Sequence, residues 1–555
     1  MGRKTVGAEG YAPVTVRVDA GEWLGPLPHN WNYIGYDECN YTYTPEGQEL
    51  LAEFDAFQEK PYYVRVHHLL CTGNCHSTYK WGSTNAYLED ELGTPRYDWT
   101  YVDLILDTIL AHGCKPFVEL GFMPKDLADP ARYDPSIDRG LRAYREYGWA
   151  CPPKDYGRWQ ELVYRLVRHA VERYGEDEVA SWYWELWNEP DIHYWRGTVD
   201  QFLRLYDHTA AGVKAALPQA RVGGPSVTDP AYGRRSAEYL EAFLAHCTKG
   251  TNASTGGRGA PLDFVTFHLK GGGYGPDPLH RPQKPPSVRK MLQGAQVAHE
   301  IIAQHGLTGL ECVVSECDPD GWAAGGAWDN AALNFRNTEY YPSFVATAFH
   351  KLTAFALERA WDLRLLSWAF LFVGERCFEG TRAFSTQGID KPILNLLRMY
   401  ARLGDRQVRL VSSAAKDPLA YADPWGSEED ADVSGLAALA GGKSLQVLIY
   451  HHHDDWARTG GRDVTVEVQH LPFASGEVML RHYRIDGAHS NAYAEWVRQG
   501  RPMYPSGSQR QALRTRAGLE LVEAPRSLTV ADGRVTLQFT LPLHGISLLE
   551  ISSQG

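Results

Sequence analysis

Two acidic residues, Glu189 and Glu316, each stand at the end of an apolar run. The first run is SWYWELW at 181–187, and the second is LECVVSE at 310–316, whose last residue is Glu316. An ionisable side chain at the end of an apolar strand lies where the packed core stops and solvent begins. Two carboxyls brought to one such rim can cleave a glycosidic bond, one as the nucleophile and the other as the proton donor.

Retaining hydrolysis of this kind needs the two carboxyl groups about 5–5.5 Å apart. At that separation the negative charge of the attacking carboxylate would raise the pKa of the other carboxyl and keep it protonated near neutrality. Asn188 immediately precedes Glu189 and can hydrogen-bond the sugar hydroxyl next to the reacting carbon. Pro190 ends the strand and stiffens the turn. The structural alternative is that both glutamates are salt-bridged rim residues.

The elements that would position these residues form a repeating pattern between residues 31 and 404. Eight strand-like apolar runs lie at 31–36, 62–67, 115–121, 181–187, 220–225, 263–269, 310–316 and 363–372. Amphipathic stretches such as 156–175 separate them, with apolar residues at the spacing of one buried helix face. The pattern predicts an α/β fold, a (β/α)8 TIM barrel over 31–404. A doubly wound sheet is disfavoured because no Gly-rich phosphate loop follows the first strand.

The pattern of apolar and turn residues changes after Asp405. Runs at 444–452, 463–471 and 534–551 alternate with Gly, Pro and Asp turns, which predicts an accessory antiparallel β-sandwich over 405–555. The alternating segment VTVRVDA lies within 1–30, and we expect it to join the sandwich and not the barrel. The sandwich would support the barrel or form a homo-oligomer contact.

Composition excludes several classes of partner. A net charge of −13 disfavours nucleic acid and anionic membrane surfaces. No run approaches about 18 apolar residues, no apolar segment follows the basic start, and the nine cysteines are scattered. These features predict a cytoplasmic protein with no membrane partner. The 17 Trp and 31 Tyr suit sugar rings, although aromatic residues fill cores equally well.

Rival chemistries have weaker support. The segment YHHHDDW at 450–456 offers three histidines and two aspartates to a metal, but side chains alternate on a strand, so adjacent histidines cannot all converge on one ion. The sequence therefore predicts no metal and no cofactor. A serine nucleophile would need a G-x-S-x-G elbow, which is absent. A non-catalytic carbohydrate-binding protein stays open, but it would need neither glutamate.

Several segments resemble glycoside hydrolase family 39, whose characterised members include β-D-xylosidases and α-L-iduronidases. They are YVRVHHLL, KPFVELGFMP, WYWELWNEPD, RVGGPS, GIDKPILNLLRMYARLG and YRIDGAHSNAYAEW. The resemblance runs nearly end to end and covers both predicted domains. It implies that Glu189 is the acid/base and Glu316 the nucleophile of a double displacement through a glycosyl-enzyme intermediate.

The resemblance also implies roles for other residues near the strand ends. His67 would contact the substrate and Arg65 would support the nucleophile, whereas the alternative for His67 is a satisfied core histidine. His268 can hydrogen-bond a sugar hydroxyl or the nucleophile. Trp368 is either a platform under the sugar or barrel core. Glu375 resembles the acidic position that holds distal hydroxyls in the family's xylosidases.

The identity of the sugar depends on two cations. Lys270 follows His268 by two residues, as in the iduronidase branch, and Arg382 fits a second cation that would face a uronate carboxylate. The alternative is that Lys270 is solvated and that Arg382 pairs with Glu375 or Glu379. We expect an exo-acting, retaining β-D-xylosidase that takes a small oligosaccharide as substrate. An iduronide-like, uronate- or arabinose-containing substrate is the alternative.

Overall fold

The computed structural model contains a closed barrel of eight parallel strands. The structure describes residues 13–36, 38–57, 61–75, 82–129, 131, 148–231, 234–272, 285–321, 326–327, 330–368, 374–380, 382–421, 430–473 and 476–553. The barrel strands are β2 (Tyr33–Tyr36), β3 (Tyr63–Val66), β6 (Lys115–Leu120), β7 (Tyr183–Leu186), β8 (Arg221–Val227), β9 (Phe264–Lys270), β10 (Glu311–Asp318) and β11 (Leu363–Trp368). Each falls within or beside one predicted run, which confirms the predicted fold class.

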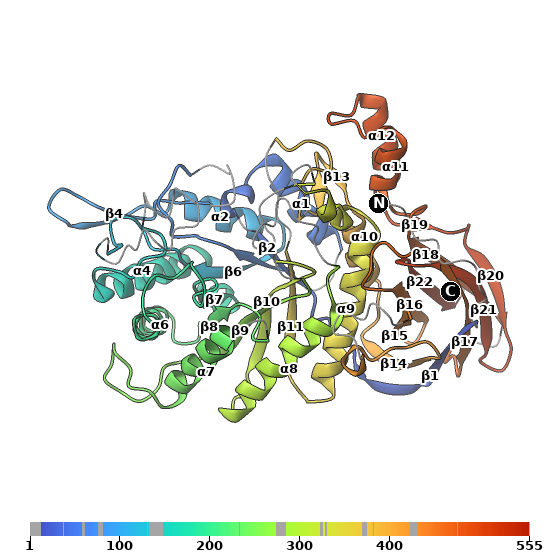
Figure 1. Ribbon diagram of the computed structural model, residues 1–555, viewed down its shortest axis with the longest axis horizontal. Coiled ribbons are helices and arrows are strands. Elements are labelled where there is room, and N and C mark those ends of the chain that lie inside the picture. The colour runs from blue at the N-terminus through green and yellow to red at the C-terminus, as the bar shows by residue number, and fades with distance from the viewer. Residues whose placement is uncertain are drawn as a thin grey trace.

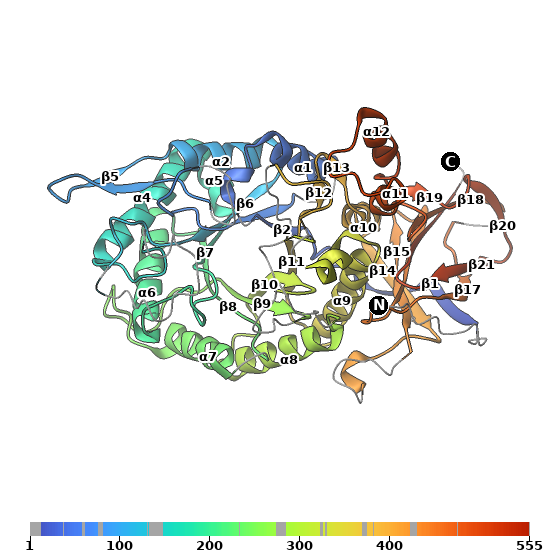
Figure 2. The ribbon, with the colours of Figure 1, turned by 45° about the horizontal axis from the view of Figure 1, so that its top comes forward.

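Helices surround the barrel (Figure 2). They are α1 (Pro45–Ala56), α2 (Thr100–Ala111), α4 (Tyr156–Tyr174), α5 (Glu176–Ala180), α6 (Val199–Ala216), α7 (Arg234–Lys249), α8 (Val288–Gln304), α9 (Tyr340–Leu357) and α10 (Pro392–Tyr400). Helix α4 illustrates how its start and end are encoded in the sequence. Asp155 caps it by accepting the Arg158 N–H, and Gly175 follows its end with φ 90°.

The interior of the barrel is packed with large side chains. Tyr33, Phe117, Tyr183, Phe264, Val313, Leu366 and Trp368 form one buried cluster there. The hydroxyl groups of Tyr33 and Tyr183 lie 3.0 Å apart, and Tyr183 donates a hydrogen bond to Glu311 at 2.5 Å. The barrel is therefore a solid core, and chemistry is confined to the rim where the strands end.

A second, mostly antiparallel sheet of ten strands lies beside the barrel (Figure 1). Its strands are β1 (Val14–Pro26), β14 (Arg406–Ser412), β15 (Asp432–Ala440), β16 (Ser444–His452), β17 (Gly461–Gln469), β18 (Gly476–Ile485), β19 (Glu520–Leu521), β20 (Arg526–Val530), β21 (Val535–Pro542) and β22 (Ile546–Ser553). Strand β1 lies between β14 and β17, antiparallel to the first and parallel to the second. The sheet encloses a core of its own, which includes Val16, Val466 and Leu537.

The remaining elements are short. They are η1 (Cys39–Tyr41), β4 (Tyr87–Glu89), β5 (Pro95–Tyr97), η4 (Ala331–Asn337), β12 (Ser385–Thr386), β13 (Ile389–Asp390), η5 (Pro418–Ala420), α11 (Ala492–Arg498) and α12 (Gly507–Thr515). Tyr493 and Trp496 of α11 pack on Phe378 in the segment that follows β11. The C-terminal part of the chain thus helps to hold a loop of the barrel.

Cysteine burial and helix composition bear on the expected environment of the protein. All nine cysteines are buried and free. No helix among the described residues combines the length and the apolar composition needed to cross a membrane. The cytoplasmic location stays a prediction.

Candidate active site

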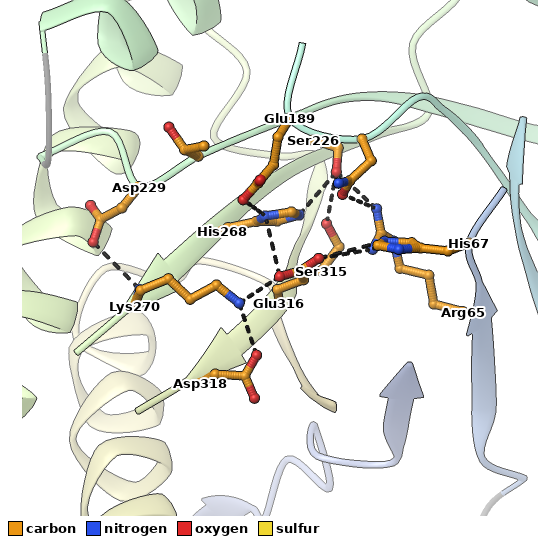
Figure 3. A network of polar contacts seen from close by, with 12 residues as sticks. Arg65, His67, Glu189, Ser226, Asp229, His268, Lys270, Ser315, Glu316 and Asp318 are labelled. Carbon is orange, nitrogen blue, oxygen red and sulfur yellow. Dashed lines mark hydrogen bonds and ion pairs between the residues drawn. The ribbon is translucent and has the colours of Figure 1, made fainter. Parts of the chain in front are cut away.

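Glu189 and Glu316 meet at the carboxyl ends of the barrel strands (Figure 3). One carboxylate oxygen of each, together with a ring nitrogen of His268, lies within 4.8 Å of the others. The side chain of Glu189 is 15% exposed and that of Glu316 is 8% exposed. The two carboxyl groups are therefore close together and mostly buried, but each keeps some solvent-exposed surface.

The backbone that presents Glu189 is strained. Trp187, Glu189 and Ser226 have φ values of 67°, 43° and 54°, in the left-handed region that costs a non-glycine residue about 1–2 kcal/mol. Neighbouring strands hold this conformation, because the Glu189 N–H donates to the Ser226 carbonyl at 2.8 Å and the Trp187 N–H donates to the Leu120 carbonyl at 3.2 Å. Backbone strain of this kind is found at functional sites, where a side chain must be held in one orientation.

Arg65 organises the floor of the site. Its guanidinium donates to Glu185 at 2.6 Å, Glu119 at 2.8 Å, Ser226 at 2.9 Å and Asn188 at 3.2 Å, and it is completely buried. A guanidinium only donates hydrogen bonds, so each of these partners must turn an acceptor towards it. Arg65 thereby fixes the orientation of Asn188, whose Oδ1 faces the guanidinium.

Glu119 and Glu185 escaped prediction. Both lie inside apolar strands, in KPFVEL and WYWEL. A charged residue within a buried strand is itself a signal that it has a polar partner in the core. Burial raises the pKa of Glu119, and the charges of His67 and Arg65 oppose that effect. These two buried carboxyls compensate the charge of Arg65 beneath the catalytic pair.

His67 lies between Arg65 and Glu316. Its Nε2 is 2.6 Å from Arg65 Nη1, 3.1 Å from a Glu119 oxygen and 3.5 Å from Glu316 Oε1. The structure thus places His67 beside Glu316, among charged partners.

Three cations surround Glu316. Lys270 Nζ donates to Glu316 Oε2 at 2.5 Å, Arg65 Nη1 lies 3.6 Å from Oε1, and Arg382 Nη2 lies 3.8 Å from Oε2. The fully buried carboxylate of Asp318 accepts from Lys270 at 2.8 Å and from Arg382 at 2.5 Å. Asp318, which sequence reasoning overlooked, therefore holds both cations in place.

The alternative reading of the two cations is wrong. Lys270 is only 8% exposed and is not solvated, since β9 extends to include it. Arg382 pairs with Asp318, Glu379 pairs with Arg376, and among the described residues no ion pair joins Arg382 to Glu375 or Glu379. Both cations belong to the site.

His268 bridges the two candidate catalytic residues. Its Nδ1 lies 2.9 Å from Glu189 Oε1 and 3.7 Å from Glu316 Oε2, and its Nε2 lies 3.0 Å from Ser226 Oγ. The imidazole is fully buried. Sequence reasoning missed Ser226, whose available signal was its position directly after Gly-Gly-Pro within β8, the fifth strand of the barrel.

The electrostatics of the two carboxyls differ from the expectation for Glu189. Burial raises the pKa of Glu316, but the charge of Lys270, followed by the charge of His268, the hydrogen bond from His67 and the charge of Arg382, outweighs it and holds that pKa well below its ordinary value. Burial also raises the pKa of Glu189, yet the hydrogen bond and charge of His268 exceed it, and the net pKa is lowered. Glu316 pushes the pKa of Glu189 upward as predicted, but His268 dominates in the free site.

Trp368 belongs to the packed interior. Its ring has no exposed surface and lies 4.5 Å from the His67 ring, with the Arg65 and Arg382 guanidinium carbons each 5.5 Å from its centroid. Gly35 leaves room for it, because a Cβ there would lie 2.1 Å from the indole. The structure favours the barrel-core alternative over a sugar platform.

Glu375 is not brought into the cluster. It lies next to Gly380 and interacts with Lys391 and Glu379. Burial raises its pKa to about 8. Within the described part of the chain no hydrogen bond or ion pair joins Glu375 to Glu189 or Glu316, so its role at distal hydroxyls stays a prediction.

Neither candidate metal cluster suits a cation. Within the described part of the chain, Glu189, His268 and Glu316 are the one group close enough to share an ion, but Lys270 and two arginines already surround Glu316 and would repel it. His451 and His452 diverge as strand alternation requires, the first towards the Leu541 carbonyl and the second towards Ser343.

A parallel barrel with paired carboxylates at its carboxyl rim defines a glycoside hydrolase. The family model for glycosyl hydrolases family 39 matches residues 14–536, and the chain belongs to this family.

Similar proteins include enzymes with two kinds of activity. A beta-xylosidase of Geobacillus stearothermophilus is 27% identical over 492 residues, which cover 82% of this chain and 81% of that protein. An alpha-L-iduronidase of Mus musculus is 25% identical over 574 residues, which cover 98% of this chain and 81% of that protein. The crystal structure of a monomeric beta-xylosidase from Caulobacter crescentus CB15 superposes with a TM-score of 0.76 at 22% identity, covering 98% of this chain and 100% of that one.

Proposed function

We propose that this glycoside hydrolase is an exo-acting, retaining β-D-xylosidase in which Glu316 is the nucleophile and Glu189 the acid/base. The observation that carries the proposal is the approach of the two carboxylates to within 4.8 Å across one opening. That separation suits direct attack on the sugar, since an inverting pair would stand about 6.5–9.5 Å apart to admit a water molecule.

In the first step a carboxylate oxygen of Glu316 attacks the anomeric carbon. The bond between that carbon and the leaving oxygen breaks, and the leaving oxygen takes a proton from Glu189. A glycosyl ester on Glu316 results. In the second step Glu189 removes a proton from water, the water oxygen bonds to the anomeric carbon, and the ester bond to Glu316 breaks. Two inversions give retention.

The surroundings suit each role. Lys270 and Arg382 stabilise the ionised Glu316, which is the form that attacks. Asn188 accepts from Arg65 through Oδ1, which leaves its NH2 group as a donor to the sugar hydroxyl beside the anomeric carbon. Because the pKa values of both carboxyls are lowered in the free site, we expect kcat/KM to be greatest on the acidic side of neutrality.

A neutral pentose is the better substrate for this charge arrangement. Lys270 and Arg382 are the cations that would recognise a uronate, but Asp318 already takes a hydrogen bond from each. A uronate carboxylate placed there would meet the charges of both Asp318 and Glu316. The beta-xylosidase relatives, 27% and 29% identical, support the same sugar.

An α-L-iduronide is the second candidate. The burial of Lys270 and Arg382 beside the nucleophile favours it, as does the alpha-L-iduronidase similarity over 98% of the chain. The two sugars share the stereochemistry around the reacting carbon, so one catalytic pair would serve both.

A panel of aryl glycosides decides between them. The β-D-xyloside should be hydrolysed with the highest kcat/KM, ahead of the α-L-iduronide, α-L-arabinoside and β-D-glucoside. A preference for the iduronide would overturn the xylosidase proposal and assign Lys270 and Arg382 to substrate recognition. Proton NMR of the first-formed product should show the β anomer, and the α anomer would refute the retaining mechanism.

The cysteines and the net charge bear on where the enzyme acts and on what it binds. Nine buried thiols without a disulfide suit a reducing compartment, which supports action on short oligosaccharides inside the cell. The net charge of −13 supports a small glycoside, and not nucleic acid or an anionic membrane, as the partner.

A further inference from the structure

The hydroxyl of Ser226 joins the guanidinium below the site to the histidine beside the catalytic pair. Ser226 Oγ lies 2.9 Å from Arg65 Nη2 and 3.0 Å from His268 Nε2, and Ser315 Oγ is farther away at 3.5 Å. All four residues are completely buried. Figure 3 shows the resulting path from Arg65 through Ser226 and His268 to Glu189.

When the His268 imidazole is neutral, counting protons along this path assigns their positions. Arg65 can only donate, so Ser226 Oγ must accept from it. The single proton of Ser226 is then available to His268 Nε2, whose 3.0 Å separation is shorter than the 3.5 Å to Ser315. An Nε2 that accepts carries no proton in a neutral imidazole, so the ring proton lies on Nδ1 and points at Glu189 Oε1, 2.9 Å away.

We propose that Ser226 is a positioning residue that holds His268 in the Nδ1–H tautomer and thereby distinguishes the two oxygens of Glu189. Oε1 is kept as a hydrogen-bond acceptor, and Oε2 is the oxygen that carries the catalytic proton to the leaving group. The inference rests on the proposed role of Glu189 as acid/base.

The opposite tautomer would work against catalysis. With its proton on Nε2, His268 would turn a lone pair towards Glu189, and a protonated Glu189 would donate to His268 in place of the leaving group. Ser226 blocks this arrangement by supplying a donor to Nε2. The same residue also accepts the Glu189 N–H through its carbonyl, so one residue aligns both the backbone of the acid/base and its histidine partner.

Variants of Ser226 test the proposal through the pH profile. Ser226→Gly removes the hydroxyl and suits a φ of 54°, so it should fold even if Ser226→Ala does not. Since the His268 hydrogen bond lowers the pKa of Glu189, loss of the tautomer lock should raise that pKa. The basic limb of kcat/KM then moves to higher pH, and kcat/KM for a glycoside with a poor leaving group falls about tenfold.

Matched controls separate this effect from general damage. Ser315→Ala removes a neighbouring buried hydroxyl and should leave the basic limb in place. His268→Phe should move the limb further than Ser226→Gly does, and the double variant should show no additional shift. The charged groups that also face Glu189 and His268 are Glu316, Lys270, Arg65 and Asp191, and every variant retains them.

Neutron diffraction of deuterated crystals of the full-length protein locates the protons themselves. Deuterium on His268 Nδ1 and on Ser226 Oγ, directed at Nε2, supports the proposal. Deuterium on Nε2, or a basic limb unmoved in Ser226→Gly, overturns it. Failure of the acid/base assignment would appear differently, as a Glu189→Ala variant equally slow on good and poor leaving groups.

Discussion

Among the described residues, one cluster of histidines and acids lies at the barrel rim and another lies between the barrel and the sheet. The second, here the interface cluster, consists of His451, His452, Asp454 and His544. In the active site, Glu316 of β10 and Glu189 of the segment after β7 lie close together. Arg65 from β3 and His268 and Lys270 from β9 point towards them. In the interface cluster, three of the four members come from one stretch of sequence and turn apart.

The difference is one of geometry and charge. His451 binds the Leu541 carbonyl within the sheet, His452 binds Ser343 on α9, and Asp454 accepts the Val288 N–H at the start of α8. Burial lowers the pKa values of His451 and His452, which favours neutral rings. The interface cluster therefore joins the sheet to the barrel, and residues that look like a site in the sequence serve as structural connections.

Removing the nucleophile should give the largest effect. Glu316→Ala should lower kcat about 10⁴-fold or more on every substrate, since no covalent intermediate can form. Steady-state rates on an aryl xyloside measure this. Asp454→Asn in the interface cluster should change the same rate less than about twofold, and comparable losses in both variants would erase the distinction between the clusters.

Removing the acid/base should give a smaller and selective effect. Glu189→Ala should slow glycosides with poor leaving groups about 10²–10⁴-fold, because they need a proton in the first step. An activated aryl glycoside should lose much less in that step. A plot of log kcat/KM against leaving-group pKa should steepen in the variant, and an unchanged slope would remove Glu189 from this role.

Replacing Lys270 should raise the pKa of Glu316. Lys270→Met removes the largest of the influences that hold the pKa of Glu316 down, so that pKa should rise. Attack requires ionised Glu316, and the acidic limb of kcat/KM should therefore move to higher pH. A limb that stays in place would show that Arg65, Arg382 and His268 suffice. Arg376→Met, which removes a cation that pairs with Glu379, is the matched control.

The smallest effect is expected in the interface cluster and concerns stability. Burial raises the pKa of Asp454 from 3.8 to about 7, so the folded protein binds a proton that the unfolded chain releases. This contribution to stability is complete below about pH 4 and is lost as the pH rises through 7. Asp454→Asn should flatten the fall in urea midpoint over that window. An unchanged pH dependence would exclude Asp454 as its source.

The parts of the fold that follow periodic patterns could be predicted. The eight barrel strands repeat an apolar signal, and α4 shows its buried face at residues such as Leu162 and Leu166. Glu189 and Glu316 were visible because each interrupts that signal where a strand ends. The pairing of β1 with β14 and β17 also agrees with its alternating sequence.

Other site residues could not be found in this way. The Ser226 hydroxyl lies 2.9 Å from Arg65 and 3.0 Å from His268, and no sequence periodicity encodes such a contact. The net pKa of Glu189 depends on which neighbour outweighs the others, and that balance needs coordinates. Trp368 was ambiguous because a strand-end tryptophan serves equally as core or platform, and only its complete burial distinguishes the two.

Trapping the covalent intermediate tests the assignment of the catalytic pair. A β-xyloside with fluorine in place of the hydroxyl next to the anomeric carbon, and with a good leaving group, should inactivate the enzyme by slowing the second step more than the first. Peptide mapping by mass spectrometry should then find one sugar esterified to Glu316. A sugar on any other carboxylate, or turnover without a covalent adduct and with inversion at the anomeric carbon, would contradict the proposed mechanism.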